Sequence, residues 1–197
     1  MSVVKEQRTK PILLLSGTPA SGKDTISASL QELNSRFRHF KKHRGSEEPK
    51  DDATYVHVDI KKFNRLAEQG AFVQYHSRYG RGYGVALSEL ENHWELGELP
   101  IIHVGKYENI KPFIDAGLEV RSVLLMVDKM ETKRRLKLRH PRDKEEIAKR
   151  LAAYQEERDE LAELIRSGIK LAFNLILDNS GNDPQQIAEQ IAMVYQS

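Results

Sequence analysis

The chain has 197 residues, of which 39% are hydrophobic and 30% charged, a balance typical of one globular domain rather than a disordered or fibrous chain. It contains no cysteine, which excludes disulfide frameworks, thiolate metal sites and thiol nucleophiles, and which favours a reducing, cytoplasmic location. The net charge is only +2, from 31 basic and 29 acidic side chains, which disfavours general nucleic-acid binding.

The first predicted element is a short apolar strand over residues 11–16. This run is far shorter than the ~20 apolar residues that cross a bilayer, so we expect no membrane span and no signal peptide. Residues 24–34 carry apolar side chains at helical spacing and predict a helix. The stretch 37–59 is basic and then acidic, and we expect a strand only at its end, over 55–58.

Beyond residue 59 the sequence alternates helical patterns with short apolar runs. The predicted helices cover 60–69, 86–96, 129–138, 144–165 and 184–195. The predicted strands cover 72–75, 100–104, 120–127 and 175–177, and a glycine-rich loop occupies 77–84. This alternation predicts an α/β fold, with a parallel sheet wrapped by helices.

A G-x-x-x-x-G-K motif lies between the first predicted strand and the first predicted helix. Its residues are Gly17, Thr18, Pro19, Ala20, Ser21, Gly22 and Lys23. In this context the glycines let backbone N–H groups turn towards phosphate oxygens, the helix start adds positive potential, and the lysine brings a charge to the transferring group. The motif therefore predicts a P-loop NTPase fold that binds ATP.

The residue after the lysine departs from the usual pattern of this loop. A Ser or Thr normally stands there and contacts Mg²⁺. Here Asp24 takes that position and Thr25 follows it. We therefore expect Asp24 or Thr25 to hold the magnesium ion.

Downstream of this loop the sequence resembles the guanylate kinase family of nucleoside-monophosphate kinases. The family has an Arg-x-x-Arg-x-x-Glu segment, a Tyr, a Phe-x-Glu strand and a Tyr-Gly-Thr/Ser loop. The resemblance implies that the matching residues bind the acceptor: Lys41, Arg44, Glu47, Tyr55, Gln74 and Tyr83.

The arginine-rich lid of the family matches residues 134–151 without a gap. The resemblance implies that Arg135, Arg139 and Arg150 contact the ATP phosphates and the transferred phosphoryl group, together with Lys23. Guanidinium groups suit this task because phosphoryl transfer is catalysed mainly by positioning and charge neutralisation. Near the last predicted strand, Asn179 is a candidate for reading adenine, although Asp178 fits the same register.

Three positions depart from the pattern with which the family reads guanine. The family glutamate is Gln74, its hydroxyl residue is Val85 and its aspartate is Gly105. Guanine presents N–H donors, so the loss of two carboxylates and a hydroxyl predicts poor selection of GMP. Asp24, the segment 83–85 and Gly105 are instead similar to ribose 1,5-bisphosphate phosphokinase, a relative within the same superfamily.

We interpret the chain as an ATP- and Mg²⁺-dependent phosphotransferase that acts on a small phosphorylated molecule, GMP or a related nucleoside monophosphate. Two alternatives remain: a ribose 1,5-bisphosphate phosphokinase, and a non-catalytic binding module of the same fold. The expected core covers 1–35 and 98–197, the acceptor-binding insertion 36–97, and the lid about 139–150. Whether the protein is a monomer or a homodimer stays open.

Overall fold

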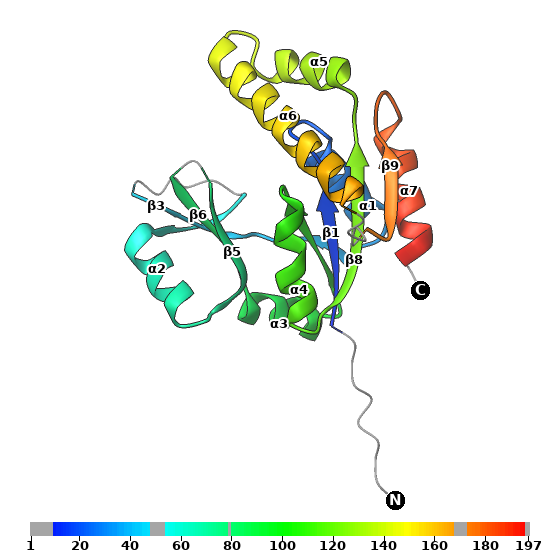
Figure 1. The fold of residues 1–197 in the computed structure, drawn as a ribbon. Helices are drawn as coiled ribbons and strands as arrows, with labels where there is room; N and C mark the ends of the chain where they lie inside the picture. The colour runs from blue at the N-terminus through cyan, green and yellow to red at the C-terminus, as the bar shows by residue number, and fades with distance from the viewer. Residues whose placement is uncertain (1–9, 48–53, 79, 168–172, 196–197) are drawn as a thin grey trace, which may run out of the picture.

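We analysed a computed structural model of the chain, which describes residues 10–47, 54–78, 80–167 and 173–195. These residues form two sheets beside each other, with helices around the larger sheet (Figure 1). The α/β fold with a parallel sheet flanked by helices is confirmed. No helix among these residues has the length and apolar character needed to cross a membrane.

The larger sheet has five strands, and every pair in it is parallel. In spatial order its strands are β2 (Phe37–His39), β7 (Leu99–Val104), β1 (Pro11–Ser16), β8 (Glu119–Met126) and β9 (Leu175–Asp178). The central strand β1 is buried on both faces: Leu13 and Leu15 belong to one hydrophobic cluster, and Ile12 and Leu14 to another. This double coverage explains why β1 is a continuous apolar run.

Helices supply the two layers that cover this sheet. On one face α1 (Lys23–Leu33) packs against α7 (Pro184–Tyr195). The other face is covered by α3 (Leu87–Glu95), the 3₁₀ helix η1 (Tyr107–Ile110) and α4 (Lys111–Asp115). The short η1 and α4 have no counterpart in the sequence-based expectations, since neither is long enough to show helical periodicity.

The smaller sheet has four strands, in the order β4 (Val56–Asp59), β3 (His43–Ser46), β6 (Arg81–Ala86) and β5 (Phe72–Arg78). Helix α2 (Ile60–Glu68) lies on it through Phe63. A Cβ atom at Gly82 would lie 2.4 Å from the Phe63 ring, and one at Gly45 only 2.6 Å from Phe63. These glycines are therefore needed because the ring rests directly on the strands.

The glycine-rich stretch 77–84 was predicted to be a loop, and this prediction was wrong: β5 and β6 form an antiparallel hairpin through it. The structure also pairs β2 with β7 of the larger sheet, whereas residue 36 was expected to begin the insertion. The smaller sheet with α2 accordingly spans 43–86, and α3 packs with the core.

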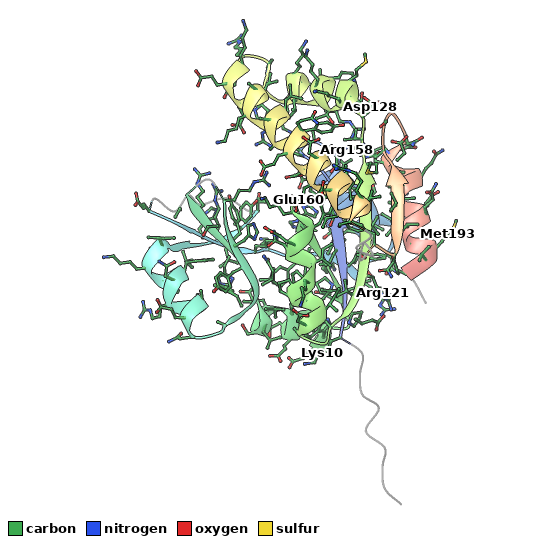
Figure 2. The ribbon with its side chains drawn as sticks, viewed as in Figure 1. Lys10, Arg121, Asp128, Arg158, Glu160 and Met193 are labelled. Atoms are coloured by element: carbon green, nitrogen blue, oxygen red, sulfur yellow. The ribbon has the colours of Figure 1, made fainter. Side chains whose placement is uncertain are left out.

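Helices α5 (Lys129–Arg139) and α6 (Lys144–Arg166) form a hairpin beyond the carboxyl ends of the central strands (Figure 1). Each begins with an aspartate cap, Asp128 and Asp143, whose side chain accepts a backbone hydrogen bond. In Figure 2 Asp128 marks this end of the molecule, and Lys10 marks the opposite end. Further along α6, Leu161 is buried with Tyr107 and Leu124.

Candidate active site

A cavity of about 670 Å³ lies where the carboxyl ends of β1 and β7 face the smaller sheet and α6. In parallel α/β sheets ligands bind at this edge. The phosphate loop and α1 line it with Gly17, Pro19, Ala20, Ser21, Gly22, Lys23 and Asp24. The segment after β2 and the smaller sheet add His39, Phe40, Lys42, Arg44, Thr54, Tyr55, His76, Arg78, Arg81 and Tyr83. Strand β7 and the helical hairpin add His103, Val104, Gly105, Arg139, Glu146, Lys149, Arg150 and Glu157.

The loop between β1 and α1 has a backbone that only certain residues can follow. Gly17 has φ 152° and Gly22 has φ 95°, both in the range that favours glycine. A Cβ at Gly17 would lie 2.5 Å from the Ser21 hydroxyl oxygen, and one at Gly22 would lie 2.5 Å from the side-chain nitrogen of Asn179. Ala20 also has a positive φ, 60°, which costs about 1 kcal/mol or more. Such strain is typical of a loop shaped for a ligand.

Lys23 folds over the mouth of this loop. Its ammonium group donates to the carbonyl oxygens of Gly17 at 2.6 Å and Thr18 at 3.2 Å, and to the Ser21 hydroxyl at 3.2 Å. Burial lowers the pKa of Lys23 to about 8, an effect that Glu157 and Asp24 partly offset. A bound phosphate would offer this ammonium a full negative charge in place of neutral carbonyl groups.

Arg135 and Asn179 support the loop from outside the cavity. The Arg135 guanidinium donates to the carbonyl oxygens of Ala20 at 3.2 Å and Asn179 at 2.6 Å, while its Nε donates to Glu131. The Asn179 side chain donates to the Ser21 carbonyl oxygen at 2.8 Å. Neither side chain is among the groups that line the cavity. In this structure both side chains therefore hydrogen-bond to main-chain oxygens of the loop.

The candidate magnesium ligands differ in position. Asp24 lines the cavity and keeps 71% of its side chain exposed, with Oδ1 3.5 Å from His103 Nδ1. Thr25 is exposed and does not line the cavity. In the described part of the chain no three His, Cys, Asp or Glu side chains gather as a metal site. A single carboxylate fits Mg²⁺ held mainly by waters and substrate phosphates, which is how this ion binds in kinases.

Two buried hydroxyl groups lie at the start of the phosphate loop. Ser16 and Thr18 are buried, and their hydroxyl oxygens have no hydrogen-bond partner among the residues that the structure describes. Buried polar groups are normally paired, but neither residue lines the cavity, so these hydroxyls do not identify a ligand.

On the acceptor side the structure brings together three of the six expected residues. Arg44 packs on two neighbouring aromatic rings, with its guanidinium carbon 5.2 Å from the Tyr55 centroid and 6.0 Å from the Tyr83 centroid. All three line the cavity. A guanidinium and two tyrosines that line the same cavity are suited to binding a phosphomonoester.

The other three expected residues lie elsewhere. Lys41 and Glu47 are exposed and outside the cavity lining. Gln74 is buried, but its amide donates to Asn109 Oδ1 at 2.9 Å and is 3.0 Å from His76 Nδ1. It does not line the cavity either.

Lys42, beside Lys41, enters the cavity and donates to the main-chain oxygen of His103. Burial, together with the nearby charge of Lys23, lowers the pKa of Lys42 to about 8. Sequence reasoning missed this residue because the spacing of the family segment points to Lys41. Lys42 is two residues before Arg44, so the alternation of side chains along β3 would have identified Lys42 only if this strand had been predicted.

From the helical hairpin, Arg139 and Arg150 both reach the cavity. Arg150 is paired with Glu146 at 2.6 Å, one turn earlier on α6. The same helix contributes Glu157, a carboxylate that is 2% exposed and ion-paired at 3.0 Å with Arg78 of β5. Burial raises the pKa of Glu157, and Arg78 opposes this shift.

Sequence reasoning missed Arg78, His76 and Glu157. The period-two alternation of β5 places Gln74, His76 and Arg78 on one face. A strand predicted beyond residue 75 would therefore have identified His76 and Arg78. His76 stacks on Tyr83, with ring centroids 5.5 Å apart. Burial lowers the pKa of His76 to about 4, so its imidazole is neutral near pH 7.

Comparisons with known proteins agree with this fold. The sequence matches no curated protein. Among solved structures, guanylate kinase from Anaplasma phagocytophilum aligns with a TM-score of 0.65 and 21% identity, over 94% of this chain and 84% of that chain. An uncharacterized protein from Eubacterium ventriosum aligns with a TM-score of 0.48 and 11% identity, over 95% of this chain and 99% of that one. The family model described as guanylate kinase matches residues 8–195, nearly the whole sequence, and the chain therefore belongs to the guanylate kinase family.

Proposed function

We propose that the protein is a cytoplasmic kinase that transfers the γ-phosphoryl group of ATP to a phosphorylated small molecule. One observation carries the proposal: a single cavity is lined by the phosphate loop, by the Arg44–Tyr55–Tyr83 cluster and by Arg139 and Arg150. A donor triphosphate and an acceptor phosphate bound at these places would both lie in one enclosed space.

The residues that line the cavity have different roles in the proposed transfer, according to their position. The loop backbone and Lys23 hold the donor phosphates, while Arg44 with Tyr55 and Tyr83 holds the acceptor phosphate. Arg139 and Arg150 approach from α5 and α6 and stabilise the negative charge that spreads over the equatorial oxygens during transfer. Direct transfer between the two bound phosphates requires no covalent intermediate on the protein.

Asp24 would hold Mg²⁺, which when bound neutralises charge on the donor phosphates. Arg135 keeps the loop in shape through the Ala20 and Asn179 carbonyl groups, so its part in transfer is to position the loop. Closure of the acceptor-binding part over the bound substrates would exclude water, which would otherwise hydrolyse ATP.

The three positions with which the family reads guanine offer no free acceptor group to the cavity in this chain. Gln74 is already committed to Asn109, Val85 is fully buried, and Gly105 has no side chain. We therefore propose that GMP is a poor acceptor, because its base donors would lack partners. The ribose 1,5-bisphosphate reading is favoured by the lining itself, in which eight Lys and Arg side chains face three carboxylates. The binding-module reading is disfavoured because Lys23, Arg139 and Arg150 are all present at the cavity.

The test is ADP release from ATP and Mg²⁺ with a panel of acceptors: GMP, dGMP, AMP and ribose 1,5-bisphosphate. The Lys23→Ala variant, purified in parallel, controls for contaminating kinases. We expect one acceptor to react with a kcat/KM of about 10⁴ M⁻¹s⁻¹ or higher, and GMP to fall well below it. ATP binding without turnover of any acceptor would support the binding module instead, and efficient turnover of GMP would show that the base is read by other groups.

A further inference from the structure

The ion pair between Arg78 and Glu157 joins two parts of the molecule across the cavity. Arg78 ends strand β5, Glu157 lies in the middle of α6, and the two are 79 residues apart in sequence. The carboxylate is 2% exposed and the arginine side chain 31% exposed, and both line the cavity. Arg78 is thus anchored from behind by a buried partner, with part of its surface open to a ligand.

Gly105, at the end of β7, makes room for this arrangement. A Cβ atom at Gly105 would lie 3.0 Å from the Arg78 Nη1 and 3.8 Å from the Glu157 Oε1. An aspartate at this position would therefore bring a second carboxylate against the same guanidinium. Because Gly105 has no side chain, Arg78 meets only one carboxylate there among the interactions described, that of Glu157.

The chemistry of the surrounding wall agrees with an anionic ligand. On the same face of β5, His76 is neutral near pH 7 because burial lowers its pKa to about 4. Arg81, three residues further along the hairpin, and Lys42, from the segment before β3, also line the cavity. The three lining carboxylates, Asp24, Glu146 and Glu157, stand at the phosphate loop and on α6, so the strands of the smaller sheet contribute none.

We infer that Arg78, oriented by Glu157 above Gly105, is a specificity-determining residue that binds a second anionic group of the acceptor. This inference rests on the proposed function, since it concerns the acceptor of that reaction. The acceptor would then carry one phosphate at Arg44 and another anionic group at Arg78, where a purine base has only neutral edges. A planar guanidinium matches the oxygens of a phosphate or carboxylate, and such charge-assisted bonds are strong.

The test compares ligands that differ only by the second phosphate: ribose 5-phosphate with ribose 1,5-bisphosphate, and GMP with guanosine 3′,5′-bisphosphate. Binding is measured by calorimetry on the full chain, with the donor site filled by a non-hydrolysable ATP analogue and Mg²⁺. We expect the wild type to bind at least one bisphosphate about tenfold or more tightly than its monophosphate. The pair that shows the preference distinguishes a sugar acceptor from a nucleotide acceptor.

Two variants probe the assignment. In Arg78→Gln the preference should fall below about threefold, while the affinity for the monophosphate changes little. Gly105→Asp keeps the arginine but brings a second carboxylate against its guanidinium, and should cause the same loss. The matched control is Arg38→Gln, because Arg38 forms an equivalent 3.0 Å ion pair with Glu98 outside the cavity.

Equal binding of monophosphate and bisphosphate by the wild type overturns the inference, as does a preference that survives in Arg78→Gln. Because the readout is binding, it is separate from the proposed function. A protein that shows the preference but transfers no phosphoryl group contradicts the kinase proposal alone. A kinase whose preference does not depend on Arg78 contradicts the inference alone.

Discussion

The phosphate loop and the acceptor wall are built in different ways. The loop presents main-chain groups, and its shape is fixed by Gly17, Gly22 and bonds from Arg135 and Asn179. The acceptor wall, by which we mean the cavity side of the smaller sheet, presents side chains such as Arg44 and Tyr83. A site made of main-chain groups constrains the spacing of the glycines that shape it. In a site made of side chains, each residue can be substituted without changing the backbone. The same donor site can therefore serve different acceptors within one fold.

Replacing Lys23 should break the donor side for every acceptor. We expect Lys23→Ala to lower kcat/KM by about 10³-fold or more, because the ammonium faces the phosphates in the transition state. The melting temperature should change little, since the bonds of Lys23 are all within the loop. Steady-state kinetics with a thermal melt checks both; near-normal turnover would remove Lys23 from the mechanism.

The lid arginines should separate into two kinds. Arg139→Ala and Arg150→Ala should each lower kcat by about 10²-fold with a smaller effect on ATP affinity, because both face the cavity. Arg135→Ala should weaken ATP binding as well, because it releases the loop carbonyl groups. Arg134, which is exposed and paired with Glu131, is the control. If kcat is unchanged in Arg139→Ala and Arg150→Ala, these arginines are surface charges.

On the acceptor side, the effect should be smaller and confined to one substrate. Arg44→Gln should raise the KM for the acceptor by about 10- to 100-fold while leaving the KM for ATP unchanged. Kinetics at saturating ATP measures this, with Arg38→Gln as the surface control. An equal rise in both KM values would show that the two sites are not built separately.

The mildest perturbation is a change of pH. Since burial lowers the pKa of Lys23 to about 8, the ligand-free protein loses this charge above that pH, and ATP affinity should fall about tenfold per pH unit. Stability should move the other way. The unfolded chain holds the proton up to the ordinary value of 10.5, so the free energy of unfolding should rise between pH 8 and 10.5.

Titration calorimetry and denaturant melts from pH 7 to 10.5 test these two trends. In Lys23→Ala the remaining ATP affinity should no longer depend on pH in this range, and the free energy of unfolding should depend on pH less strongly than in the wild type. The remainder belongs to Lys42, whose pKa burial also lowers to about 8. An ATP affinity that stays constant above pH 8 would contradict the shift at Lys23.

Sequence alone was enough where the signal is local. The helix over 184–195 was predicted with the bounds that the structure gives, because Pro184 opens it and its apolar spacing is regular. The strand over 11–16 and the motif after it were equally clear. Strands β2 and β3 were missed because they are short and polar, and the β5–β6 hairpin because its glycines suggest a loop.

The site was predictable only in part, for the same reason. Motif spacing brought Lys23, Arg44 and Tyr83 to one cavity. It could not show that Gln74 turns to Asn109, because that bond depends on how η1 packs against β5. Nor could it find the partnership of Arg78 with Glu157, which is created only when α6 crosses to the smaller sheet.

Helix α6 runs without interruption from Lys144 to Arg166 and contains no glycine or proline. Arg150 and Glu157 are seven residues apart on it, so they share one face about 10 Å apart along the axis. The helix therefore fixes the distance between the donor and acceptor ends of the cavity. One residue inserted between them would turn Arg150 away by about 100°, whereas substitutions on the outer face would leave the spacing of the two side chains unchanged. The length of this segment is therefore more constrained than its composition.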